Sequence, residues 1–456
     1  MTLLLVVTLS GLVGYLYFVE FPRERAKTQK ETEDKQLLPF ERQAITGLTV
    51  RSFGDEVVLA AAENGSWKIT SPLQAEADSR EVDAILRALA IGKVSRVIEE
   101  RATPLEPFGL EKPTVVLTVT AGSQKETVAI GDIGPITSTL YVRRDSDKKI
   151  LLTDLAAKDF LNKRLYTFRR KEVLRFDSAQ AERLRLTYPK NEIVLYRSDQ
   201  MDKNKKHKWL LRAPLEAPAD ATVVRTLLSK LEDMRTLGFV DPGPERDAVV
   251  KKLKDPQIRL SLYEGGAEKT VKFYQPDPTS GEAYAVTAPE APIYRISPGL
   301  IKELTKEVFT FRDKRLLGTE VEDIAVLTVK TREEQYALIN QTGTWVLESK
   351  PEEKLDQQKV ELFVSRVAGL PAELFVVKEG GPLPPYGLSN PSAELTATGK
   401  DGKVKGRLVL GAKTEGLVYA MGSALGGIYQ VRADILSQIP SSGELARSSA
   451  SGLPPP

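Results

Sequence analysis

The sequence predicts an α+β protein of three tandem modules, each a mostly antiparallel sheet with one longer and one shorter helix. Three observations support this: three evenly spaced tryptophans, an acidic residue and an apolar helical stripe after each, and strand-like segments at matching distances downstream. An apolar N-terminal segment is expected to carry the modules on a single transmembrane helix. At 456 residues the chain is too long for one ordinary core.

The tryptophans mark the repeat most clearly. Trp67, Trp209 and Trp345 recur at nearly equal intervals along the chain, and each opens a short phrase that ends in proline. Such a period indicates repeated structural units. We expect a strand bearing the tryptophan and then a proline-marked turn. Because a large aromatic that recurs in an alternating strand usually fills a core, we favour this role over a stacking platform for sugars or lipids.

A longer helix is predicted after each tryptophan phrase. Asp78, Asp220 and Asp356 each precede apolar residues at a helical spacing. An aspartate at this place can accept hydrogen bonds from free backbone amides and complement the helix dipole. Helix capping therefore explains these carboxylates without a catalytic role.

Further landmarks keep the same register. Aromatic-led strands are expected at Tyr141, Tyr284 and Tyr419, which follow their tryptophans at almost identical distances. The phrase from Phe108 to Pro113 recurs from Tyr386 to Pro391, and the two prolines lie equally far after their tryptophans. A last strand, starting at Ile150, Ile293 and Ile428, precedes the shorter helix.

The junctions also repeat. Tyr166–Lys171 closes the first copy and Phe309–Lys314 closes the second at the corresponding place, whereas the third copy runs into a tail rich in serine, glycine and proline. A phrase that occurs where another copy follows is expected to seat one module on the next. We predict inter-module ion pairs for Arg169 and Arg312, in preference to anion binding.

These landmarks define the expected organisation of the chain. It comprises a transmembrane anchor at 1–20, a charged stalk at 21–44, modules at 45–172, 173–317 and 318–440, and a disordered tail at 441–456.

The anchor is predicted from residues 2–19, an unbroken uncharged run rich in leucine and valine. As a helix this run would span roughly 27 Å, close to the thickness of a bilayer core. The aromatic end of this segment favours a retained anchor over a cleaved signal peptide. Basic residues follow the segment rather than precede it, so charge alone would hold that side in the cytoplasm. Charge leaves the orientation and the true start site open.

Composition excludes several kinds of chemistry. The chain has no cysteine and one histidine, His207, which rules out disulfides, thiolate zinc sites and multi-histidine metal sites. The common phosphate-loop, zinc-protease, nucleophile-elbow and dinucleotide motifs do not occur. A net charge of +3 gives no general field for nucleic acid, and we interpret the basic run 203–208 as a solvated loop. We therefore predict no catalytic, cofactor-binding or metal-ligating residues.

The tryptophan phrase, the helix-capping aspartate, the aromatic-Gly-Leu phrase and the Thr-Phe-Arg junction together resemble the repeat family known as DUF4340. The resemblance covers residues 45–440, in three copies. It implies one N-terminal membrane helix, extracytoplasmic repeats in the periplasm of a bacterium, and an association with ABC-type export systems of the gliding-motility type. The family has no established activity and no catalytic residues.

We therefore expect a non-catalytic accessory or scaffold subunit of an envelope ABC-type transport complex, held in the inner membrane through residues 2–19. The alternative is an envelope module that binds polysaccharide or lipid, for which aromatic residues should line an exposed concave face. A hydrolase would need a polar cluster specific to one copy, and the copy-specific insertion at 199–208 is a candidate that we interpret as a surface loop.

Overall fold

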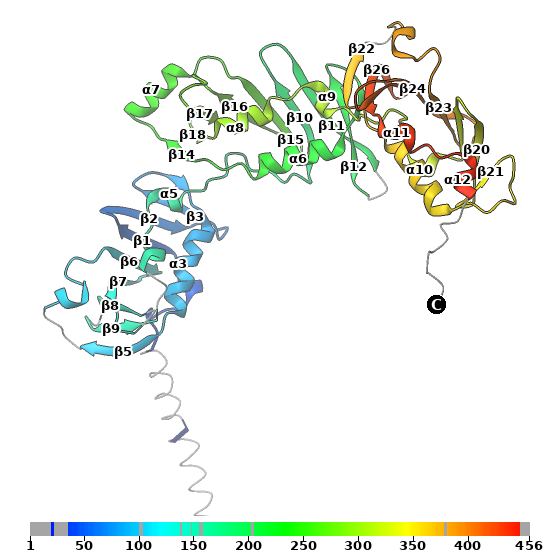
Figure 1. The fold of residues 1–456 in the computed structure, drawn as a ribbon. Helices are drawn as coiled ribbons and strands as arrows, with labels where there is room; N and C mark the ends of the chain where they lie inside the picture. Colours follow the sequence, from blue (N-terminus) through cyan, green and yellow to red (C-terminus); the bar gives the residue numbers. More distant parts are fainter. Residues whose placement is uncertain are drawn as a thin grey trace, which may run out of the picture. The chain divides into compact units, whose positions relative to one another are not determined.

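The computed structural model describes residues 20–21, 35–99, 104–136, 139–146, 148–154, 158–201, 205–377 and 381–446. In these residues the chain forms three antiparallel sheets of nine, nine and eight strands together with helices, which confirms the α+β class (Figure 1). Each sheet contains one of the three tryptophan strands. The predicted repeat of three modules is therefore confirmed.

The first module has the strand order β4-β3-β2-β1-β6-β7-β8-β9-β5. The strands are β1 Gly47–Ser52, β2 Asp55–Ala61, β3 Trp67–Ser71, β4 Ala75–Glu76, β5 Val94–Glu99, β6 Val115–Ala121, β7 Gln124–Ile133, β8 Leu140–Arg144 and β9 Ile150–Thr153. The helices are η2 Arg42–Ala44, α3 Ser79–Ile91, η3 Glu106–Phe108, α4 Lys158–Leu161 and α5 Leu165–Phe168. Helix α3 links β4 and β5, the two edges of this sheet, and packs its apolar stripe into the core.

The second module repeats this order as β13-β12-β11-β10-β15-β16-β17-β18-β14. The strands are β10 Ala181–Thr187, β11 Glu192–Met201, β12 His207–Ala213, β13 Ala217–Ala219, β14 Gly238–Val240, β15 Ile258–Glu264, β16 Ala267–Tyr274, β17 Ala283–Val286 and β18 Ile293–Ile296. The helices are α6 Ala221–Glu232, α7 Pro244–Lys252, α8 Pro298–Leu304 and α9 Val308–Phe311.

The third module follows the order β21-β20-β19-β23-β24-β25-β26-β22. The strands are β19 Val326–Thr331, β20 Gln335–Gln341, β21 Thr344–Leu347, β22 Leu374–Val377, β23 Ala393–Thr398, β24 Val404–Lys413, β25 Leu417–Gly422 and β26 Leu425–Arg432. The helices are η4 Val321–Asp323, α10 Gln357–Gly369, η5 Pro384–Tyr386, α11 Asp434–Ser437 and α12 Ser442–Ala446. In place of an outer edge strand, the side-chain amide of Gln357 hydrogen-bonds both backbone groups of Trp345, at 2.8 and 3.0 Å.

The chain divides into two compact units that do not follow the module boundaries. The first consists of Met1–Val173, Met234–Arg246 and Pro292–Ile296, and the second contains the rest. Strands β14 and β18 therefore belong to the same unit as the first module.

The tryptophans and the capping aspartates behave as predicted. Trp67, Trp209 and Trp345 are 6, 4 and 3 % exposed, so they fill the cores and offer no stacking platform. The carboxylates of Asp78, Asp220 and Asp356 accept hydrogen bonds from amides in the first turns of α3, α6 and α10. These features fix the position of the long helix in each module.

The first core starts before the expected boundary at residue 45. Leu37 and Leu38, which we assigned to the charged stalk, are buried in the core of the first module. The amide of Val94 in β5 donates to the carbonyl of Lys35 at 2.9 Å. The two adjacent leucines therefore make residues 35–38 part of the first module, although the neighbouring residues in the sequence are mostly charged.

The third module ends later than residue 440. We expected residues 441–456 to be disordered, but 442–446 form helix α12, and Leu445 is fully buried in the third core. The side chain of Ser442 bonds to Glu334, with 2.7 Å between Oγ and Oε2. The rest of the predicted tail, 447–456, lies outside the described residues.

Two smaller expectations also change. Each module ends with two short helices rather than one, and the second module has α7 in addition. In the copy-specific insertion at 199–208, Asp199–Met201 belong to β11 and His207 and Lys208 to β12, so these parts extend the two strands rather than forming a loop. Residues 202–204 lie outside the described residues. Nδ1 of His207 lies 2.9 Å from the carbonyl oxygen of Ser198, in a hydrogen bond within this hairpin.

In the part of the chain that the structure describes, no helix is long and apolar enough to cross a membrane. The predicted anchor at 2–19 lies outside the described residues.

Truncation tests the role of α12. A chain that ends after Pro440 should lose about 2–5 kcal/mol of stability in the third module, because it lacks the buried Leu445 side chain. A chain that ends after Ala446 should keep its stability. Urea unfolding followed by Trp345 fluorescence, with Trp67 and Trp209 replaced by Phe, measures both. An equal loss of stability in the two truncated chains would contradict the assignment of α12 to the third module.

Candidate functional site

The recurring junction phrases contact residues of the next module where one module follows another. Among the described residues, no group of three or more histidines, aspartates or glutamates is arranged to hold a metal ion. The junction sequences recur from one module to the next, and the junctions therefore form the candidate site. The first joint consists of residues 166–173 and the residues of β14, β18 and their flanks that contact them, all within the first compact unit.

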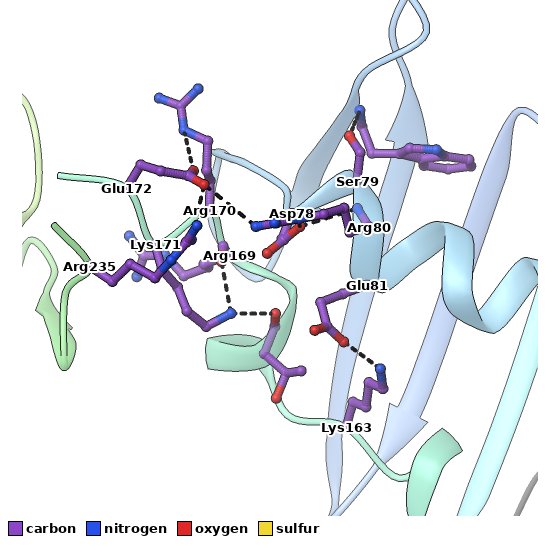
Figure 2. Close-up of polar contacts among 12 residues, drawn as sticks. Asp78, Ser79, Arg80, Glu81, Lys163, Arg169, Arg170, Lys171, Glu172 and Arg235 are labelled. Atoms are coloured by element: carbon purple, nitrogen blue, oxygen red, sulfur yellow. Dashed lines mark hydrogen bonds and ion pairs between the residues drawn. The ribbon is translucent and has the colours of Figure 1, made fainter. Parts of the chain in front are cut away.

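Helix α5 closes the first module on its own long helix. Phe168 at the end of α5 is fully buried, and its carbonyl accepts the amide of Asp78 at 2.7 Å. The Asp78 carboxylate in turn accepts the amide of Arg80 at 3.1 Å (Figure 2). One residue thus links the closing helix to the start of α3 through its backbone and caps that helix through its side chain.

The same closure recurs in every module. The amide of Asp220 donates to the carbonyl of Phe311 at 2.8 Å, and the amide of Asp356 donates to that of Leu445 at 2.9 Å. Leu445 therefore takes the place of the phenylalanine in the third module. The sequence concealed this equivalence because the third copy keeps only the apolar character of the residue.

A second recurring bond joins the segment after the closing helix to a residue at the start of an edge strand, or two residues before it, in the sheet that follows. In the first joint the amide of Thr236 donates to the carbonyl of Lys171 at 2.9 Å. The corresponding bond runs from Ala372 to Lys314 at 2.8 Å. The bond from Val94 to Lys35, described above, is the third of this kind.

Aromatic rings form the apolar part of the first joint. The ring of Phe239 lies between those of Tyr166 and Tyr294, with centroids 5.9 Å away on either side. The guanidinium of Arg169 lies 3.6 Å from the centroid of Phe239, and the amine of Lys171 lies 5.2 Å from that of Tyr166. Cations over aromatic faces are attracted by the ring quadrupole.

Arg169 forms the inter-module ion pair that we predicted. Its side chain is almost fully buried and lies 2.6 Å from a carboxylate oxygen of Asp241, just after β14. A guanidinium buried to this degree requires a paired carboxylate. Arg169 is therefore committed to the joint and is not free to bind an anion.

The outer part of the joint is a balanced network of charges (Figure 2). Glu172 lies 3.0 Å from Arg235, 3.6 Å from Arg80 and 3.7 Å from Arg170. Arg170 also pairs with Glu76. Arg80 also pairs with Asp78 at 3.3 Å, so each of the three guanidiniums has a carboxylate partner within the joint. The network is therefore suited to holding the joint rather than a charged ligand.

Two pKa shifts reflect this surrounding. Partial burial lowers the pKa of the Lys171 amine, and the nearby carboxylate of Asp78 opposes that shift. The hydrogen bond to Asp78 raises the pKa of the Arg80 guanidinium. The guanidinium of Arg80 therefore keeps its charge in the joint.

The second joint, residues 309–316 with β22 and β26, has aromatic residues at the same three positions, but here the tyrosine of the inner strand is the central ring. Phe309 stacks on Tyr429 at 6.1 Å between centroids, and Phe375 lies 5.4 Å from the same tyrosine. The amine of Lys314 lies 5.2 Å from the ring of Phe309, as Lys171 does from Tyr166.

The charges of the second joint differ. We predicted an ion pair for Arg312, but its guanidinium lies beside the hydroxyl of Tyr429 instead. Burial raises the pKa of that hydroxyl, and Arg312 opposes the shift. The ion pairs belong to Arg315, which binds Asp313 at 2.7 Å and Glu320 at 2.9 Å. The prediction for Arg312 was wrong because the third module has Val377 near the place of Asp241.

The two ends of the series, the first sheet and the last closing helix, lack the aromatic residues that the joints use. In the first sheet the pair equivalent to Phe239 and Tyr294 is Val97 and Leu151. In α12 the residue two before the buried Leu445 is Gly443, where α5 and α9 have an aromatic. Within the described chain, this aromatic contact is therefore specific to the two internal junctions.

Comparison with known protein families identifies a match. The family model DUF4340, described as a domain of unknown function, matches residues 67–256, 209–381 and 345–444. Each match starts at a tryptophan strand, and the first two run through a joint into the next module. No curated protein matches the chain.

Loss of one charge in the first joint should open it to proteolysis. Asp241→Asn leaves the buried guanidinium of Arg169 without its carboxylate, which is strongly destabilising. We expect trypsin to cleave after residues 169–171 at least about tenfold faster in this variant, as measured by mass spectrometry of the fragments. Glu216→Gln removes an exposed ion pair and should leave the rate unchanged.

Two neighbouring residues of β22 allow a test of the aromatic contact in the second joint. Phe375→Ala should destabilise the third module by about 1–2 kcal/mol, since it removes the ring that packs on Tyr429. The neighbouring Leu374 is similarly exposed, and Leu374→Ala should cost no more than about 0.5 kcal/mol. Unfolding followed by Trp345 fluorescence compares them, and equal effects would argue against the aromatic joint.

Proposed function

This chain belongs to the DUF4340 family, and on that basis we propose that it is a non-catalytic scaffold that acts through its module surfaces. The observation that carries the proposal is the recurring joint. Both internal junctions repeat the same two backbone bonds and the same contact between an edge-strand phenylalanine and the tyrosine of the neighbouring strand. Such joints fix each module's end against the next strand, as a chain that presents surfaces in series requires.

We further propose that residues 2–19 anchor this scaffold in the inner membrane of a bacterium, with the modules on the extracytoplasmic side. The uncharged length of that segment supports the anchor. The resemblance to DUF4340 proteins supports the orientation and the partner, an ABC-type transport complex of the gliding-motility type, for which this chain would be an accessory subunit.

The tryptophans do not favour the alternative of a polysaccharide-binding module. Such a module needs aromatic faces open to sugar rings, but all three tryptophans are buried. The joint aromatics already pack on one another and on cations. This distribution favours the scaffold.

Purification from the native membrane tests the proposal. The tagged full-length chain, extracted in a mild detergent, should bring along an ABC permease and its ATPase, as identified by mass spectrometry. A chain that starts at Lys35 lacks residues 1–34 and should lose the membrane fraction and these partners. Recovery of the full-length chain alone, or with envelope glycan, would contradict the accessory-subunit assignment.

A further inference from the structure

Three of the most exposed apolar side chains in the described part of the chain lie at one end of the first module. Ile91 and Ile133 are each 71 % exposed, and Ile136 is 61 % exposed. Ile91 is the last residue of α3, Ile133 is the last residue of β7, and Ile136 lies on the loop that leads to β8. Single exposed apolar residues are ordinary on protein surfaces. Their common position is what calls for an explanation.

The strand register places the isoleucines where the chain enters the module. Val94, the first residue of β5, lies in one row across β9 and β8 with Ile133 of β7 (Figure 1). Neighbouring strands lie about 4.8 Å apart, so this row is about 14 Å long. Ile91 directly precedes Val94 in the chain with two residues between them, and Ile136 follows Ile133 in the same way. The amide of Val94 bonds the carbonyl of Lys35 at 2.9 Å, so the entering chain lies at this same end.

This end has a different neighbour in each of the other modules. In the second and third modules it meets the preceding module, through the bonds from Thr236 to Lys171 and from Ala372 to Lys314. In the first module the chain that arrives here comes from the predicted anchor. Residues 20–34 separate that anchor from Lys35, and a chain of this length spans at most about 50 Å. The end that bears the isoleucines is therefore the end tethered to the membrane.

The exposed isoleucine of α3 is specific to the first module. Ile91 follows the capping residue Asp78 at the same distance as Asp233 follows Asp220 and Gly369 follows Asp356. The second module thus has a carboxylate at this position, and the third has no side chain.

The loop after β7 shows the same difference. The pair of Ile133 with Leu140 corresponds to the pair of Lys413 with Val418 in the third module, where Thr-Glu-Gly follows the lysine. In the second module the loop at 275–282 consists of polar residues, two prolines and one glycine. Exposed isoleucines at this end thus occur in the copy that follows the predicted anchor, and the other two copies have polar residues or glycine there.

We propose that Ile91, Ile133 and Ile136 insert into the surface of the lipid bilayer, so that the first module rests on the membrane through this end. The proposal rests on the membrane anchor proposed above. Insertion removes the apolar surface of the three side chains from water. They form separate points along one end of the module rather than a groove, which suits a lipid surface better than a peptide. Lys35 and Lys93 are exposed at the same end, and their long side chains can reach the lipid headgroups.

A fluorescent label at the loop tests the contact in the full-length chain. The chain has no cysteine, so Ile136→Cys allows nitrobenzoxadiazole to be attached at one position. The protein is reconstituted in vesicles of phosphatidylethanolamine and phosphatidylglycerol, with or without a nitroxide on the acyl chains. The nitroxide lipid should quench most of the fluorescence. Thr279→Cys, at the corresponding place in the second module, is the matched control and should keep its fluorescence.

A second variant tests whether the other isoleucines hold the loop on the lipid. Ile91→Asp with Ile133→Asp, added to the labelled chain, should abolish most of the quenching, because a carboxylate is costly to place among acyl chains. Both residues are exposed, so the fold should tolerate the changes.

Flotation of the labelled chain with the vesicles separates this proposal from the anchor. A chain that floats but is quenched equally at residues 136 and 279, or at neither, would overturn the contact and leave the anchor standing. Unchanged quenching in the double aspartate variant would also overturn the contact. A chain that does not float would overturn the anchor, and this contact with it.

Discussion

One backbone hydrogen bond organises each module: the amide of the residue that caps the long helix donates to a carbonyl in the closing helix. Asp78, Asp220 and Asp356 all make it, at 2.7 to 2.9 Å. The amides at a helix start have no partner within the helix, so partners from elsewhere can determine what lies there. Here the partner of the capping residue's amide is a carbonyl in the closing helix of the same module. The closing helix also buries Phe168, Phe311 or Leu445 in the core.

The joints follow from this closure. Only two residues separate the carbonyl of Phe168, which closes the first module, from that of Lys171, which pairs with the next sheet. The second joint has the same spacing between Phe311 and Lys314. In so short a linker, side chains must lie against the neighbouring strand. This accounts for the aromatic rings and paired charges that gather there.

Local periodicity in the sequence predicted the modules, the buried tryptophans, the helix caps and the ion pair of Arg169. It did not predict the residues whose contacts are with residues far away in the chain. The aromatic pairs in β14 with β18, and β22 with β26, were missed, although Phe239 and Phe375 recur at the same interval as Trp209 and Trp345. Leu37 and Leu38 were missed because charged neighbours concealed a repeat of the Lys-x-apolar-Leu start seen at Lys171 and Lys314. Leu445 was missed because a different residue fills the same space.

Hydrogen exchange at the bonded amides tests the closure and the joints together. The relevant amides are those of Asp78, Asp220, Asp356, Thr236 and Ala372 in the wild-type chain. If these bonds organise the modules, the amides should exchange as slowly as those of the inner strands, and as a group. Exchange at the rate of exposed turns would show that the modules neither close nor join in this way.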